Sequence, residues 1–126
     1  MDNPNHKKIL IVEDDSMISS MYKMKLESSG YSVLVAENGM DGLSIAKKEK
    51  PSIIMLDVIL PQIDGFAVLE ELKSDKATKD IPVVVLTNLG TEEDIDKGKK
   101  LGAVDYIVKS NLTPGEVMEK VGKIIS

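Results

Sequence analysis

The sequence predicts an α/β fold in which a doubly wound, mostly parallel sheet carries helices on both faces. Three observations lead to this class. Five short apolar runs rich in β-branched residues recur along the chain, segments with helical spacing separate them, and each segment opens with a residue that caps helices. Because strands and helices alternate strictly, the connections are expected to be right-handed crossovers, which make neighbouring strands parallel.

The predicted strands are apolar almost throughout, which is typical of strands buried on both faces of a parallel sheet. They cover residues 8–12, 32–36, 52–56, 82–86 and 104–108.

The predicted helices are recognised by their first residues. Candidate N-caps follow the five strands in chain order at Asp15, Asn38, Asp64, Thr91 and Thr113. The last helix is marked most strongly, because Pro114 occupies its first position and Glu116 lies three residues after the capping threonine.

Two of these helices carry further expectations. In the first, we interpret Met17, Met21 and Met24 as part of the buried face rather than as a binding surface. The fourth, residues 91–101, has few apolar residues and contains Gly98, so we expect it to be weakly packed and able to adopt two states.

Composition limits the function further. The chain has 126 residues, enough for one domain, and we expect a polar tail over 1–6 followed by the domain over 7–126. The absence of cysteine excludes disulfides and thiolate chemistry. All 16 basic residues are lysines, so the chain has no arginine to read guanine or phosphate and we expect no nucleic-acid binding by it alone.

No apolar stretch is long enough to span a membrane and no export signal precedes the domain, so a soluble, cytoplasmic protein is expected.

Polar residues follow the predicted strands at one edge of the sheet. Glu13, Asp14 and Asp15 follow the first strand, and Asp57 follows the third. We interpret Asp15 as a helix cap. Asp57 lies in an apolar stretch, where a carboxylate needs a partner or a bound cation.

The fourth and fifth predicted strands end at Thr87 and Lys109. Ligands of such sheets bind beyond the carboxyl ends of the strands, so carboxylates, a hydroxyl and an ammonium are expected to converge there. Oxygen ligands of this kind suit Mg²⁺ or Mn²⁺, and Asp57 is placed to act as a nucleophile toward phosphorus.

Four motifs resemble the receiver domain of bacterial two-component response regulators, namely residues 11–15, 56–65, 85–87 and 102–109. The resemblance covers the chain from residue 7 to residue 126. It implies a flavodoxin-like (βα)5 fold with strand order 2-1-3-4-5, and a single-domain signalling protein similar to the chemotaxis regulator rather than an enzyme that turns over an external substrate.

By this resemblance Asp57 is the phosphoacceptor, which takes a phosphoryl group from the phosphohistidine of a histidine kinase or a phosphotransfer protein. Glu13, Asp14 and Asp57 hold Mg²⁺ together with the backbone carbonyl of Ile59. Lys109 pairs with one phosphoryl oxygen.

The resemblance also implies a switch. Thr87 bonds another phosphoryl oxygen, and Tyr106 turns inward as Thr87 moves; without the family context, Tyr106 is equally well explained as core packing. An unknown downstream protein is expected on the face formed by helix 91–101, the fifth strand and the last helix. The protein is expected to be a monomer or a dimer that forms on phosphorylation.

Some positions depart from the family pattern. Ser110 follows Lys109 where the family commonly has a proline after a cis peptide bond, so a trans or a strained loop is expected here. Asn88 replaces a smaller residue and narrows the approach of the donor. Ile59 and Leu89 flank the expected path of the hydrolytic water and cannot orient it, which predicts slow self-dephosphorylation.

Two other functions fit these residues poorly. A phosphatase of the haloacid dehalogenase type expects a second aspartate where Ile59 stands, and a flavin carrier would have its phosphate repelled by the acids after the first strand. The alternative that remains is a non-phosphorylated pseudo-receiver, or a receiver excised from a hybrid kinase, that acts as a protein-interaction module.

Overall fold

The computed structural model describes residues 7–125 and contains one sheet of five parallel strands. The strands are β1 (Lys8–Val12), β2 (Ser32–Ala36), β3 (Ile53–Leu56), β4 (Val83–Thr87) and β5 (Asp105–Val108). Their order in the sheet is β2-β1-β3-β4-β5, which confirms the expected topology. The expected tail over 1–6 lies outside the described residues.

Five helices connect the strands. They are α1 (Ser16–Ser28), α2 (Gly39–Glu49), α3 (Gly65–Ser74), α4 (Glu92–Lys100) and α5 (Pro114–Ile125), and a short 3-10 turn, η1 (Lys109–Asn111), precedes the last of them. The predicted caps are confirmed at Asp15, Asn38, Asp64 and Thr91, whose side chains accept hydrogen bonds from backbone N–H groups of the first turn. In α5 the backbone N–H of Thr113 donates to Glu116 and that of Glu116 donates to the Thr113 hydroxyl, a complete capping box.

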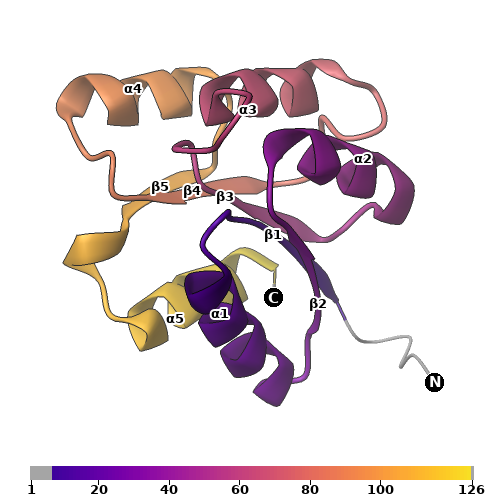
Figure 1. The fold of residues 1–126 in the computed structure, drawn as a ribbon, viewed down its shortest axis with the longest axis vertical. Coiled ribbons are helices and arrows are strands. Elements are labelled where there is room, and N and C mark those ends of the chain that lie inside the picture. The colour runs from indigo at the N-terminus through magenta and orange to yellow at the C-terminus, as the bar shows by residue number, and fades with distance from the viewer. Residues whose placement is uncertain (1–6, 126) are drawn as a thin grey trace.

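The helices cover the sheet in two layers, with α2, α3 and α4 on one face and α1 and α5 on the other (Figure 1). Each face has its own core. Leu10, Leu56 and Val85 pack beneath α2 and α3, whereas Ile11 and Met55 pack beneath α1 and α5. Neighbouring residues of one strand enter opposite cores, which explains why the strands are apolar throughout.

The interpretation of the α1 methionines is wrong for two of them. Met17 and Met24 are 83% and 71% exposed, while Met21 is only half-buried against the core. The buried face of α1 is formed instead by Ser19, Tyr22 and Leu26. At about 100° per residue Met24 lies about 200° around the helix from Tyr22, so the two exposed methionines occupy the outer side.

No helix within residues 7–125 is both long enough and apolar enough to cross a bilayer.

Candidate functional site

The topology places the ends of β1 and β3 side by side in the middle of the sheet. Val12 pairs with Leu56, so the residues that follow them, Glu13 and Asp57, leave the sheet together. The backbone N–H of Asp57 donates to the Val12 carbonyl at 3.0 Å, which extends the ladder by one residue and holds the aspartate at the edge. The predicted convergence of acids at this edge is therefore observed.

Glu13, Asp14 and Asp57 form a compact cluster of carboxylates. Each offers one oxygen, and these oxygens lie within 4.8 Å of one another. Glu13 and Asp57 are only 4% and 6% exposed, whereas Asp14 faces solvent. Two buried carboxylates at this separation repel by at least about 3.5 kcal/mol at an effective dielectric near 20, which favours binding of a cation. The donor set, made of carboxylate oxygens with one open side, fits Mg²⁺ or Mn²⁺.

Lys109 lies between the two buried carboxylates. Its ammonium donates to Oδ2 of Asp57 at 3.0 Å and also to Oε1 of Glu13. Burial lowers the pKa of Lys109, but the hydrogen bonds to Glu13 and Asp57 and the negative charges of both together outweigh it and raise the pKa above its ordinary value. The lysine therefore stays charged and supplies the partner that the buried aspartate requires.

The pKa of Glu13 depends on a different set of opposing effects. Burial raises the pKa of its carboxyl, the Lys109 ammonium opposes this, and the Asp57 charge adds to it, so that the pKa is raised. Its other oxygen accepts a hydrogen bond from the backbone N–H of Asp15 at 3.2 Å. The carboxylate is therefore oriented from two sides, by Lys109 after β5 and by the Asp15 N–H at the start of α1.

The loop after β3 fixes the second oxygen of Asp57. The backbone N–H of Ile59 donates to Oδ1 at 2.9 Å, while residue Ile59 as a whole is 53% exposed. The start of α3 presses closely on this loop, because a Cβ on Gly65 would lie 2.2 Å from the Cα of Val58. Only glycine fits at residue 65 without moving the chain that carries Asp57.

Thr87 and Tyr106 occupy the neighbouring strands. Thr87 is the last residue of β4 and is completely buried, and its hydroxyl accepts a hydrogen bond from the backbone N–H of Leu89 at 3.4 Å. Tyr106 on β5 is buried, and its hydroxyl donates to the carbonyl oxygen of Leu89. Burial, with the charges of Asp94 and Asp57, raises the pKa of Tyr106 to about 12. The backbone of one residue, Leu89, thus joins the threonine to the tyrosine.

The β5–α5 loop contains Ser110, which stands where the family commonly has a proline. The Lys109–Ser110 peptide is trans, and the two residues begin the turn η1. Asn88 is exposed and lines a cavity of about 320 Å³ together with Lys109 and Tyr22.

Tyr22 was missed in the sequence. It is buried on α1, and burial raises the pKa of its phenol, with the Lys109 charge lowering it and the Glu13 charge raising it. Its position in the helix core pattern is the same as that of any buried apolar residue, so no sequence signal separates it.

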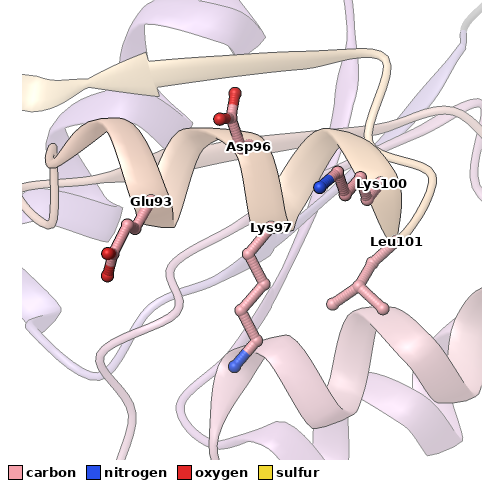
Figure 2. Close-up of a pocket in the computed structure, with 5 residues that line it drawn as sticks. All are labelled: Glu93, Asp96, Lys97, Lys100 and Leu101. Atoms are coloured by element: carbon pink, nitrogen blue, oxygen red, sulfur yellow. The ribbon is translucent and has the colours of Figure 1, made fainter.

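A second cavity, of about 390 Å³, lies beside α4. Its lining residues, shown in Figure 2, are Glu93, Asp96, Lys97, Lys100 and Leu101. All belong to α4 or its C-terminal cap. None belongs to the carboxylate cluster, so this cavity is separate from the site at the ends of β1 and β3.

A parallel sheet of this order, with carboxylates after its first and third strands and a threonine and a lysine at the ends of the fourth and fifth, defines the receiver class of signalling domains. Comparison with known proteins identifies the chain accordingly. The response regulator receiver domain family matches residues 9–122, and the chain belongs to this family.

Three similar proteins illustrate the relationship. The chain is 41% identical over 117 residues to the DNA-binding dual master transcriptional regulator RpaA of Synechocystis sp., which covers 93% of this chain and 47% of that protein. A CheY-like receiver domain protein from Methanospirillum hungatei superimposes with a TM-score of 0.89 at 29% identity, covering 96% of this chain and 94% of that one. The Mn²⁺-bound form of response regulator Rcp1 superimposes with a TM-score of 0.79 at 31% identity, covering 94% and 91%.

The chain spans about half the length of the first curated relatives it matches. As a receiver domain it is part of two-component signalling, in which receivers partner histidine kinases and transmit signals rather than turn over substrates. The cluster of Glu13, Asp14 and Asp57 is consistent with a phosphoacceptor site and is typical of a receiver Mg²⁺ site.

Proposed function

We propose that Asp57 accepts a phosphoryl group from the phosphohistidine of a histidine kinase or a phosphotransfer protein. The observation that carries this proposal is the environment of the Asp57 carboxylate. It is buried, it is held through one oxygen by the Ile59 N–H and through the other by Lys109, and it lies within 4.8 Å of two further carboxylates. Burying a carboxylate beside other carboxylates costs stability, so such an arrangement is more often found at functional sites than in purely structural positions.

The transfer is a displacement at phosphorus. One Asp57 oxygen forms a bond to phosphorus, the bond from phosphorus to the donor imidazole nitrogen breaks, and the electron pair of that bond stays on the imidazole. Lys109 is placed to neutralise a phosphoryl oxygen, and the Thr87 hydroxyl to bond another. Glu13, Asp14, Asp57 and the Ile59 carbonyl would hold Mg²⁺ or Mn²⁺, which supplies further charge neutralisation when bound.

The output of this reaction would be read on the face formed by α4, β5 and α5. Leu89 joins Thr87 to Tyr106, and Tyr106 packs against α4, so a movement of Thr87 would be transmitted to this face. We infer that an unidentified downstream protein, or a second copy of the phosphorylated chain, binds there, and that the protein works in the cytoplasm.

The test is the intact mass of the protein after incubation with acetyl phosphate and Mg²⁺. We expect one phosphoryl adduct that disappears in Asp57→Asn and in a sample with chelator. Asp96→Asn is the matched control, because Asp96 is an exposed acid on α4 that lies outside the cluster, and it should keep the adduct. A folded wild-type protein that forms no adduct would favour a contact-only receiver. An adduct that survives in Asp57→Asn would place the acceptor elsewhere.

A further inference from the structure

The ring of Tyr106 is held in a buried position against α4. The residue is 8% exposed, and its hydroxyl donates to the Leu89 carbonyl. The ring is therefore anchored at its far end by a hydrogen bond and at its near end by the β5 backbone. A rigid ring held at both ends cannot tilt away from a neighbour without leaving its position.

Gly98 is the neighbour that makes this position accessible. A Cβ on residue 98 would lie 2.7 Å from Cδ2 and 3.0 Å from Cε2 of Tyr106, well inside ordinary carbon–carbon contact, and 3.7 Å from Cε1 of Phe66. The missing side chain thus forms a notch in α4 that the edge of the tyrosine ring fills. Gly98 is also the only residue of α4 that is buried, while Ile95 of the same helix packs against this core but is only partly buried.

A contact between α4 and α3 opposes sliding of the helix away from the ring. The Lys97 ammonium lies 4.7 Å from the centre of the Phe66 ring, and Figure 2 shows the Lys97 side chain extending from α4 toward α3. This contact is formed by the residue next to Gly98, so it adds to the interactions that keep the notch over Tyr106. Glycine inside a helix weakens that helix relative to alanine, so Gly98 is better explained by the space it leaves than by helix stability.

We propose that Gly98 is a positioning residue that allows Tyr106 to occupy its buried position and so sets the balance between buried and exposed states of this tyrosine. The consequence for signalling rests on the proposed function, in which Tyr106 is the switch. Any larger side chain at residue 98 would displace the ring and break its hydrogen bond to Leu89. The end of β4 would then no longer be connected to α4 through Leu89 and Tyr106.

The first test asks whether Gly98→Ala raises or lowers the melting temperature, both in the wild type and in a variant that lacks the tyrosine ring. Gly122→Ala in α5 is the control, because a Cβ at residue 122 would meet only the Tyr31 hydroxyl at an ordinary 3.6 Å. It should raise the melting temperature by about 3 to 5 °C through helix propensity. Gly98→Ala should leave the melting temperature unchanged or lower it.

In a Tyr106→Leu background the ring is absent, so Gly98→Ala should raise the melting temperature as much as the control does. Tyr106→Val replaces Tyr106→Leu if that variant does not fold. Equal stabilisation by Gly98→Ala with and without the tyrosine ring would overturn the proposal.

The second test detects the ring itself by ¹⁹F NMR of protein labelled with 3-fluorotyrosine. The chain has three tyrosines, and the Tyr106 signal is assigned by its loss in Tyr106→Phe. Gly98→Ala should move this signal toward that of a solvent-exposed tyrosine and leave the other two in place. A Tyr106 signal that stays unmoved would refute the positioning role. Both tests use unphosphorylated protein, so their outcome is independent of whether Asp57 accepts phosphate.

Discussion

Replacing Lys109 with methionine leaves the two buried carboxylates beside it without their ammonium. The Lys109–Asp57 pair at 3.0 Å contributes about 5.5 kcal/mol of attraction at an effective dielectric near 20, and Glu13 accepts a second bond from the same group. Most of this attraction only offsets the cost of burying the charges. Removing one partner of a buried pair typically destabilises a protein by about 3 to 5 kcal/mol, and we expect a loss of this size for Lys109→Met.

The same geometry predicts a much smaller effect of Asp57→Asn. This change also removes the attraction to Lys109, but it relieves at least about 3.5 kcal/mol of repulsion with Glu13 and about 1 kcal/mol with the exposed Asp14. The attraction and the repulsion nearly cancel, and the neutral amide also avoids the cost of burying a charge, so the expected cost is about 1 kcal/mol at most. The neutralising lysine should therefore matter more for stability than the aspartate at the centre of the site.

The assay is urea unfolding followed by circular dichroism at neutral pH, with and without Mg²⁺. Lys120→Met is the matched control, because Lys120 pairs with Asp105 at 3.5 Å on the surface, with its side chain 47% exposed, and should cost less than about 1 kcal/mol. In chelator Lys109→Met should be the least stable variant, and Mg²⁺ should restore more stability to it than to the wild type. If Lys109→Met costs no more than Lys120→Met, the proposed balance of charges is wrong.

Three further predictions concern the switch, the rate and the loop. Because the pKa of Tyr106 is raised from 10.0 to about 12, the stability that its neutral phenol contributes is complete below pH 10 and is lost as the pH rises through 12. Tyr106→Phe should therefore lose less stability than the wild type over this alkaline range in unfolding experiments. Parallel pH profiles of stability for the two proteins would contradict this. Ile59→Asn should accelerate decay of the Asp57 phosphate by about tenfold, because one added hydrogen bond to the attacking water stabilises the transition state by about 1.4 kcal/mol. The decay is measured by intact mass over time, and an unchanged half-life would show that Ile59 does not limit hydrolysis. Gly65→Ala should destabilise the protein by about 3 kcal/mol in urea unfolding, because its Cβ would overlap the Val58 backbone, and a cost below 1 kcal/mol would mean that the loop yields easily.

Much of the fold was predictable because its signals are local. The alternation of apolar runs with capped segments predicted all five strands and all five helices, and the caps at Asp15 and Thr113 were correct to the residue. The parallel topology also placed the candidate site, since the carboxyl ends of such strands meet at one edge. The order of the strands came from family resemblance, because periodicity does not determine which strands are neighbours.

The α1 methionines show where the local signal fails. Met17, Met21 and Met24 are spaced as a helical stripe, but a stripe does not state which side of the helix faces the sheet. Tyr22 and Leu26 lie on the side that faces the sheet and are almost completely buried, so Met17 and Met24 point outward.

The sequence by itself determined which chemical groups the chain brings to the end of its sheet, because each of those groups follows its own strand. Only the tertiary structure decided how they meet. The bridge from Lys109 to Glu13 joins residues 96 positions apart, and the fit of Tyr106 into the notch at Gly98 joins a strand to a neighbouring helix. Contacts of this kind require that helices and strands are positioned relative to one another to within a few tenths of an ångström. No pattern along the chain encodes such positions.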